Sequence, residues 1–185
     1  MYSNNIQGWT TYKTLYSKWI EQAKYDLTLV EVGVWLGAGI IYAAEVAKEL
    51  KKNIKLYAVD TWQGSNEPEH KKRVEEMGGP DALYSKFLEN VEKAGVKENI
   101  SVFRGKSVDI AKIFGYNRIE CDIVFLDGSH EYQDIKDDIN AWLPIVKNNG
   151  ILAGHDIACA DVEKAVLEVL GKYDDRANDS WIYYK

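Results

Sequence analysis

Short apolar runs alternate with helical patterns through most of this chain. The apolar runs occupy 28–33, 54–59, 100–103, 122–126, 150–153 and 181–184. The helical patterns occupy 9–24, 38–51, 81–94, 107–114, 131–147 and 161–172. Such alternation is typical of a mostly parallel sheet whose two faces are covered by helices. We therefore expect an α/β three-layer sandwich.

The size and composition of the chain suit one globular domain. A chain of 185 residues can bury a single core, and contents of 46% hydrophobic and 28% charged residues exclude a disordered chain. We expect one domain over 1–185, with a helical N-terminal segment at 1–26. The long polar stretch 61–80 is expected to be a mobile lid loop, since connections of this length are usually functional.

Charge, hydropathy and cysteine spacing limit the partners and the compartment. A net charge of −6 argues against a protein that coats nucleic acid. The most apolar stretch, 27–44, contains Glu31 and three glycines, so we expect no membrane span. The first residues lack the features of a signal peptide. Cys121 and Cys159 form no CxxC pattern, and we expect two free thiols in a reducing cytoplasm.

Glycine and polar residues directly follow the apolar runs. The residues in these positions are Gly33, Asp60, Gly105, Asp127, and the pair His155 and Asp156. Sheets of this class bind ligands outside the carboxyl ends of their strands, near the point where the strand order reverses. We therefore expect these residues to surround one ligand site.

The turn after the first run excludes two nucleotide-binding motifs. A dinucleotide fingerprint needs a glycine two residues after Gly33, but Trp35 stands there and would crowd a pyrophosphate. No Gly-Lys-Ser/Thr follows, so the turn is not a P-loop either. A nucleoside without phosphates could still lie over Gly33 and Gly37. Asp60, at the end of the next run, is then placed to accept both ribose hydroxyls.

This turn and two later segments resemble one known family. Glu31-Val32-Gly33-Val34-Trp35-Leu36-Gly37 resembles the E-x-G-x-x-x-G cofactor loop of class I S-adenosylmethionine-dependent methyltransferases. The blocks Leu126-Asp127-Gly128-Ser129-His130 and Gly154-His155-Asp156 are similar to the macrocin O-methyltransferase-like subgroup, of the methyltransferase family 24 type. The resemblance covers about residues 28–184. It implies a Rossmann-like fold with a mostly parallel seven-stranded sheet and an antiparallel last strand at 181–184.

The resemblance also implies S-adenosylmethionine as cofactor and residues that bind it. In chain order these are Glu31, Gly33, Trp35, Gly37, Asp60, Thr61, Trp62, Gly105, Lys106, Ser107 and Asp127. Within this set, Asp60 would hold the ribose, and Thr61 or Trp62 would flank the adenine. The loop 105–107 would contact the adenine from the next strand.

A divalent cation is a further implication. In metal-dependent relatives such as catechol O-methyltransferases an Asp after the fourth strand binds the metal, and Asp127 matches that position. The resemblance places the other two ligands at His155 and Asp156. His155 stands where the family usually has Asp, and imidazole suits softer metals than Mg²⁺. We expect Mg²⁺ or Mn²⁺ here, with Fe²⁺, Zn²⁺ and a metal-free site as alternatives.

The resemblance implies His130 as a general base, with Asp127 beside it as the second catalytic residue. The expected reaction is methyl transfer to a hydroxyl of a small molecule such as a sugar or natural product. One alternative is an NAD-dependent oxidoreductase, against which Trp35 counts. Another is a non-catalytic cofactor-binding module, against which the complete set of Asp127, His130 and Asp156 counts.

Several other polar and aromatic patterns are expected to have structural roles. His70, in the polar stretch, has no partner pattern and is expected to be solvated. A zinc site is an alternative use of His130, His155, Asp156 and Cys159. A solvated acidic helix face is expected from Glu131, Asp134, Asp137 and Asp138. Core packing, with a homodimer surface as the alternative, is expected from Trp9, Tyr12, Tyr16 and Trp19.

Overall fold

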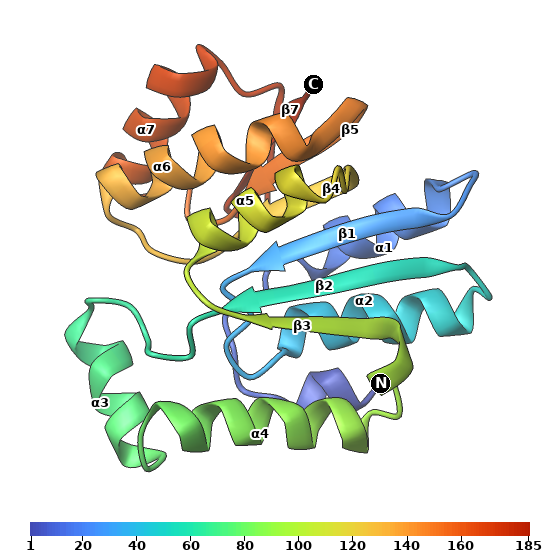
Figure 1. Ribbon diagram of the computed structural model, residues 1–185, viewed down its shortest axis with the longest axis vertical. Coiled ribbons are helices and arrows are strands. Elements are labelled where there is room, and N and C mark those ends of the chain that lie inside the picture. Colours follow the sequence, from blue (N-terminus) through green and yellow to red (C-terminus); the bar gives the residue numbers. More distant parts are fainter.

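The computed structural model describes residues 1–185 and contains one seven-stranded sheet between two layers of helices (Figure 1). The strands are β1 (Leu27–Val32), β2 (Ile54–Asp60), β3 (Ile100–Arg104), β4 (Cys121–Leu126), β5 (Val146–Gly154), β6 (Asp175–Ala177) and β7 (Ser180–Tyr184). Their order is β3-β2-β1-β4-β5-β7-β6. Strands β1 to β5 pair in parallel, and β7 is antiparallel to β5. The predicted three-layer sandwich and antiparallel last strand are confirmed.

The helices divide between the two faces of the sheet (Figure 1). The α-helices are α1 (Lys13–Gln22), α2 (Ala38–Glu49), α3 (Pro68–Glu76), α4 (Pro80–Lys93), α5 (Ser107–Tyr116), α6 (Tyr132–Trp142) and α7 (Ala160–Leu170). The short 3-10 helices are η1 (Tyr2–Asn5), η2 (Lys97–Asn99) and η3 (Leu143–Ile145). One core cluster joins α1, α2 and α4 to the sheet, and the other joins α5, α6 and α7 to its opposite face.

Strand β1 shows how the sequence produces these two cores. Successive side chains of a strand point to opposite faces. Leu29 therefore lies in the α1–α2–α4 core, while Val30 and Val32 lie in the α5–α6–α7 core. Helices cover both faces, so the strand is apolar on both sides, with Glu31 as its one buried carboxyl. The parallel pairing with β2 and β4 brings the ends of β1, β2 and β4 to one edge.

The prediction of a loop throughout 61–80 is wrong for its central part, which forms α3. Pro68 occupies the first turn of this helix, where its missing N–H costs nothing. Arg73 and Glu69 form an ion pair of 2.7 Å one turn apart. Only Val74 of this helix is buried, so the sequence carries little of the apolar periodicity by which helices are recognised.

Two element boundaries also differ from expectation. The helix predicted over 131–147 ends at Trp142, because Pro144 lies in η3 and the chain enters β5 at Val146. Strand β6 lies outside the predicted runs, since its three residues Asp175–Ala177 contain no apolar alternation.

The aromatic stripe of the N-terminal segment is divided between core and surface. Tyr12, Tyr16 and Trp19 are buried in the core, which confirms the packing prediction for them, whereas Trp9 is 43% exposed. The three buried rings pack against Phe125 of β4, so they form no dimer surface. Both cysteines are free thiols, as predicted. No helix combines the length and the hydrophobicity that a membrane span requires.

Candidate functional site

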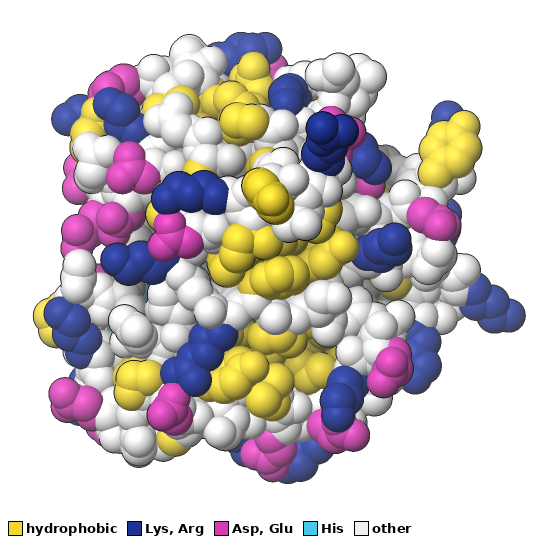
Figure 2. Space-filling view, viewed as in Figure 1, with side chains coloured by type: hydrophobic (Ala, Val, Ile, Leu, Met, Phe, Trp, Pro, Cys, Tyr) yellow, Lys and Arg dark blue, Asp and Glu magenta, His cyan; other side chains and the backbone are white.

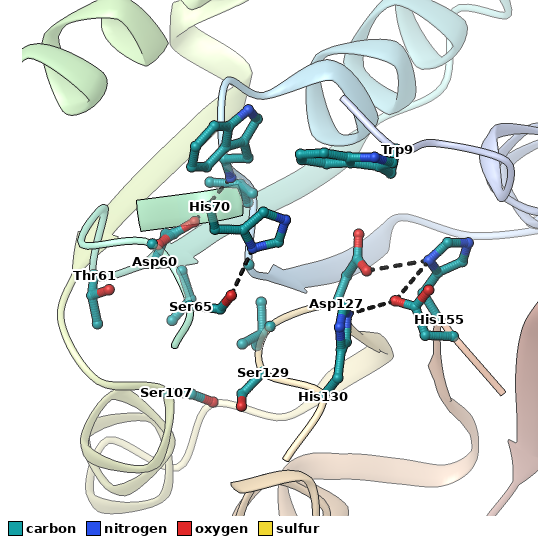
Figure 3. Close-up of a pocket in the computed structure, with 18 of the residues that line it drawn as sticks. Trp9, Asp60, Thr61, Ser65, His70, Ser107, Asp127, Ser129, His130 and His155 are labelled. Carbon is teal, nitrogen blue, oxygen red and sulfur yellow. Dashed lines mark hydrogen bonds and ion pairs between the residues drawn. The ribbon is translucent and has the colours of Figure 1, made fainter. Parts of the chain in front are cut away.

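A cavity of about 1150 Å³ opens at the carboxyl ends of the parallel strands. Its walls come from the segments after β1 to β5, from residues 7–12 of the N-terminal segment, and from 64–70 of the polar stretch. Figure 3 shows side chains from these separate segments converging on one space. The cavity therefore lies where the sequence predicted a ligand site.

The turn after β1 brings the backbone close to the end of β4. Gly33 has a φ of +84°, and a Cβ added to it would lie 2.0 Å from the backbone oxygen of Asp127. No other residue fits this position without moving the chain. The N–H of Gly33 donates to the carbonyl of Val59 at 2.8 Å, which ties the turn to β2. The backbone around Gly33 and Asp127 therefore forms a rigid part of the cavity wall.

Asp60 is held in place by the backbone of two loops. Its Oδ2 accepts the N–H of Trp35 at 2.9 Å, and its Oδ1 accepts the N–H of Trp62 at 2.7 Å. Burial raises the pKa of this carboxyl, and the hydrogen bonds from Trp62 and Trp35 oppose that shift. The carboxylate keeps capacity to accept a ligand hydroxyl, so Asp60 is a preorganised acceptor in the cavity wall.

The predicted cofactor residues divide into those that line the cavity and those that lie behind its wall. The lining residues are Gly33, Trp35, Asp60, Thr61, Gly105, Lys106, Ser107 and Asp127. Three of the residues predicted to bind the cofactor do not line it. These are Glu31, Gly37 and Trp62.

Each of these three residues has an evident structural role. The carboxyl group of Glu31 is buried, and one of its oxygens accepts a hydrogen bond from the hydroxyl of Tyr16 at 2.9 Å. Gly37 has a φ of +88° and begins α2 in a space where an added Cβ would meet Phe87. The indole of Trp62 is fully buried, and its Nε1–H donates to the carbonyl of Trp35 at 2.8 Å.

A cluster of two histidines and two aspartates lies at the other side of the cavity (Figure 3). His130 Nε2 lies 2.7 Å from Asp156 Oδ2. His155 Nδ1 lies 3.1 Å from Asp156 Oδ2 and 3.5 Å from Asp127 Oδ1. Asp127 follows β4 and Asp156 follows β5, so the parallel pairing of these strands brings the cluster together.

The charges of this cluster are strongly coupled. The hydrogen bond between His130 and Asp156 raises the pKa of His130 to about 9, although burial of the imidazole opposes this shift. Burial also opposes the charged form of His155, but Asp127 and Asp156 outweigh it and raise its pKa to about 10. The two histidines in turn lower the pKa of Asp156 despite its burial. Both imidazoles are therefore cationic at neutral pH in this arrangement.

Two groups of side chains have donor atoms close enough to surround a metal ion. Asp127, His130 and Asp156 form one group, whose donor atoms lie within 4.8 Å of one another. His155, Asp156 and Asp179 form the other. The predicted ligands Asp127 and Asp156 are thus brought together with His130 in one group, and the third predicted ligand, His155, shares the other group with Asp156. Cys159 belongs to neither group, so the alternative zinc site has no support.

Residues 64–70 and Trp9 form an aromatic and acidic rim over this cluster. The ring of His70 lies 4.9 Å from that of Trp9 and 5.9 Å from that of Trp35, centroid to centroid. Its Nδ1 lies 2.7 Å from the Ser65 hydroxyl. The prediction of a solvated His70 is therefore wrong. Glu67 Oε1 lies 2.5 Å from His130 Nδ1, which links the rim to the cluster.

The predicted solvated face of α6 is partly wrong as well. Asp134, Asp137 and Asp138 line the cavity. Burial raises the pKa of Asp138 to about 6, even though a hydrogen bond with Ser107 opposes the shift. Ser107 Oγ also accepts the indole N–H of Trp142 at 2.8 Å. The acidic residues of α6 therefore contribute to the cavity wall beside the loop 105–107.

Two further cavity residues come from segments that the motifs do not include. The hydroxyl of Thr11 lies 2.7 Å from His155 Nε2 and donates to the carbonyl of Asn178. Asp179 accepts the N–H of Ala158 at 3.0 Å. No spacing in the sequence connects these segments to β4 or β5, so only the fold reveals them.

Comparisons with known proteins agree with this geometry. A family model described as a methyltransferase domain matches residues 30–157. The O-methyltransferase NovP has a TM-score of 0.72 at 16% identity, covering 95% of this chain and 79% of NovP. CalS11, a TDP-rhamnose 3'-O-methyltransferase of calicheamicin biosynthesis, has a TM-score of 0.65 at 15% identity, covering 93% of this chain and 77% of CalS11.

A third similar structure was solved with a ligand. SMU.776, complexed with SAH, has a TM-score of 0.63 at 14% identity, covering 95% of this chain and 49% of that protein. At these identities the structures show a shared fold. No curated protein matches the sequence significantly.

Proposed function

Because the chain belongs to the S-adenosylmethionine-dependent methyltransferases of the family whose model matches residues 30–157, we propose that it methylates a hydroxyl oxygen of a small molecule. The observation that carries this proposal is the cavity itself. It has the preorganised acceptor Asp60 at one side and the cluster of Asp127, His130 and Asp156 at the other. A cofactor and an acceptor hydroxyl can therefore lie side by side.

We propose that the cofactor occupies the side of the cavity nearest β1, β2 and β3. Asp60 would accept the ribose hydroxyls, and the adenine would lie between Thr61 and the loop 105–107. The methionine part would pass over Gly33, where the close approach of the backbone leaves no side chain in the way. In this placement the sulfonium would lie on the side of the cavity that Asp127 lines.

The acceptor hydroxyl must lose its proton as the methyl group is transferred. We propose that His130 takes this proton, since its Nε2 lies in the cavity wall and is aligned by Asp156 and Glu67. His130 must be neutral to act, so the bond to Asp156 has to weaken before reaction. Holding the acceptor in line with the sulfonium supplies the rest of the catalysis.

The residues present fit a divalent cation, because two carboxylate oxygens and an imidazole nitrogen lie within 4.8 Å of one another. Asp127 and Asp156 would hold Mg²⁺ or Mn²⁺, which would lower the pKa of the acceptor hydroxyl. A cation on Asp156 would also compete with the proton of His130 for that carboxylate. Cation binding by Asp127 and Asp156 is therefore compatible with His130 acting as the general base.

We propose that 61–80 serves as the lid of this site. Gly64, Gly78 and Gly79 have positive φ values on either side of α3. The segment touches the rest of the site through Glu67, which binds His130, and through Asn66, which donates to Glu131 at 2.9 Å. The same segment also packs the ring of His70 on Trp9 and Trp35 and buries Val74, so opening of the lid would break aromatic and apolar contacts as well.

The names of the similar structures support a hydroxyl acceptor. NovP is called an O-methyltransferase, and CalS11 acts on TDP-rhamnose. The free thiols Cys121 and Cys159 support a reducing compartment such as the cytoplasm. No observation favours the oxidoreductase or the non-catalytic module.

The test combines cofactor binding with methyl transfer. Calorimetry should show binding of S-adenosylhomocysteine, with no binding of NAD. Incubation with methyl-labelled S-adenosylmethionine and a panel of hydroxylated small molecules should give a labelled ether. Cofactor binding without product over a broad panel would instead favour the non-catalytic module.

A further inference from the structure

Strand β3 forms an open edge of the sheet. It pairs only with β2 and stands at the end of the strand order. Figure 1 shows β3 between α5 and α4, with no helix lying across it. Natural sheets usually protect such an edge with a charge, a proline or a bulge, because its free backbone groups can pair with another strand. Residues 100–103 include no charged residue and no proline, and their register with β2 is regular.

The backbone groups of Val102 and Arg104 point out of this edge. The N–H of Gly105 donates to the carbonyl of Asp60 in β2 at 2.9 Å. Alternate residues of a strand direct their N–H and C=O groups to the same side. Those of Phe103 therefore also face β2, whereas those of Val102 and Arg104 face away from it. The chain offers no strand to these outward groups.

Apolar side chains flank the edge strand on both sides. In Figure 2, hydrophobic side chains form two areas separated by a narrow band, at the position that β3 occupies in Figure 1. Val102 and Phe103 of the strand are only partly buried. On the flanking helices, Leu88 of α4 is 40% exposed and Ile113 of α5 is 45% exposed. A strand that pairs here would therefore be joined by apolar contacts as well as by hydrogen bonds.

Two unpaired charges lie at the two ends of this strand. Glu98 precedes β3 and Lys106 follows it, and both side chains are exposed. Other charges near the strand have partners, such as Arg104 with Asp81 at 2.6 Å, but Glu98 and Lys106 form no ion pair. At about 3.3 Å per residue their backbones lie roughly 25 Å apart, so they cannot pair with each other. Each is complementary to the opposite end of a second copy of the strand.

We propose that β3 pairs with β3 of a second copy of this chain, in an antiparallel dimer centred on Val102. The outward N–H and C=O of Val102 then bond to those of Val102 of the partner subunit. Glu98 meets Lys106 of the partner subunit at both ends, since the two residues lie equally far from Val102 along the chain. The twofold axis is perpendicular to the sheet, so α4 meets α4 and α5 meets α5, and both apolar areas are covered.

Sedimentation equilibrium of the full chain measures the association. Wild type should be a dimer that dissociates on dilution. Val102→Pro removes the N–H that points out of the edge and leaves the hydrogen bonds to β2 in place, so the variant should be a monomer. Circular dichroism and urea unfolding establish whether the variant is folded. If it does not fold, the charge variants below decide the question.

Charge reversal tests the partner and the register. Glu98→Lys creates two like-charge contacts in the dimer, and so does Lys106→Glu, so each variant should dimerise at least about tenfold more weakly than wild type. Mixed in equal amounts, the two variants should associate about as tightly as wild type, because each then meets the opposite charge at both ends. Glu21→Lys and Lys24→Glu change exposed charges near α1 and are the matched controls, which should dimerise like wild type.

Four results would overturn the proposal. The first is a wild type that stays monomeric at the highest soluble concentration. The second is a folded Val102→Pro that dimerises as tightly as wild type. The third is a mixture of the two charge variants that associates no more tightly than either alone, and the fourth is an equal effect of the control variants. None of these measurements involves the cofactor or methyl transfer, so the result is independent of the proposed function.

Discussion

The Nε2 atom of His130 lies 2.7 Å from Oδ2 of Asp156. The opposite edge of the same ring faces Glu67 of the lid segment, at 2.5 Å. His130 is thus held between a carboxylate fixed to the end of β5 and one that belongs to 61–80. If 61–80 closes over the cavity as proposed, its movement would change the charges around His130 and would link closure to the protonation of the proposed general base.

Replacing His130 tests its role as proton acceptor. General-base assistance is typically worth about 10²–10⁴ in rate, so His130→Gln should lower kcat by at least about a hundredfold. The wild-type rate should rise with pH through a single ionisation of His130, because only the neutral imidazole accepts a proton. A cation on Asp156 should place this ionisation below the pKa of about 9 that the hydrogen bond to Asp156 produces without one. The variant should lack this rise.

Cofactor affinity provides the control for this variant. His130 does not contact the proposed adenosine site, so calorimetry with S-adenosylhomocysteine should give nearly unchanged binding. A kcat within about threefold of wild type would lie far below the range of general-base effects. His130 would then be a structural link between Asp156 and the lid, and Asp127 would have to take the proton.

Chelation tests the cation. Two carboxylates that face one space repel each other, and a divalent cation between Asp127 and Asp156 would relieve that repulsion. We expect Mn²⁺ binding detectable by electron paramagnetic resonance, and activity that is lost with EDTA and restored by Mg²⁺ or Mn²⁺. The double variant Asp127→Ala/Asp156→Ala should no longer bind Mn²⁺. Full activity after exhaustive EDTA treatment would disprove the requirement.

Removing Asp60 tests the cofactor site. Asp60→Ala should lose two charge-assisted hydrogen bonds to the ribose, about 2–4 kcal/mol of binding free energy, as measured by calorimetry with S-adenosylhomocysteine. The carboxylate also accepts the backbone N–H groups of Trp35 and Trp62, so urea unfolding should confirm that the variant is folded. Asp161→Ala, an exposed position on α7, is the matched control. If the folded Asp60→Ala variant binds S-adenosylhomocysteine as tightly as wild type, Asp60 does not bind the ribose.

The residues that the sequence located correctly lie at the ends of strands. Asp60 and Asp127 follow apolar runs, and parallel pairing of β2, β1 and β4 necessarily brings such residues to one edge. The sheet and its two helical layers followed from the same periodicity. These features depend on local sequence and on a general rule of sheet geometry.

The side-chain positions that the sequence did not predict depend on contacts between distant segments. Trp62 follows Asp60 by two residues, but a positive φ and a hydrogen bond to the Trp35 carbonyl turn its indole into the core. His70 was expected in solvent and instead packs on Trp9, which is remote in sequence. No local pattern encodes such pairings, so the side chains of the rim could not be assigned in advance.

The buried carboxyl of Glu31 predicts a pH-dependent stability that is independent of catalysis. Burial raises its pKa from an ordinary 4.5 to about 8, although the hydroxyl of Tyr16 donates to it. The folded protein thus binds this proton more tightly than the unfolded chain does. Stability must therefore fall as pH rises from about 4.5 to about 8, by about 1.4 kcal/mol per pH unit from this group.

Glu31→Gln keeps an acceptor for Tyr16 but cannot ionise. Urea unfolding of both proteins at pH 5.5, 6.5 and 7.5 isolates the effect, since every other titrating group is shared and cancels in the difference. The variant should gain on the order of 2–3 kcal/mol relative to wild type across this range. Glu21→Gln, an exposed carboxyl on α1, should show no such trend. A difference between wild type and Glu31→Gln that does not change with pH would mean that Glu31 stays ionised in the folded protein throughout this range. The hydrogen bonds from Tyr16, Tyr12 and the backbone of Ile40 would then have to balance its burial.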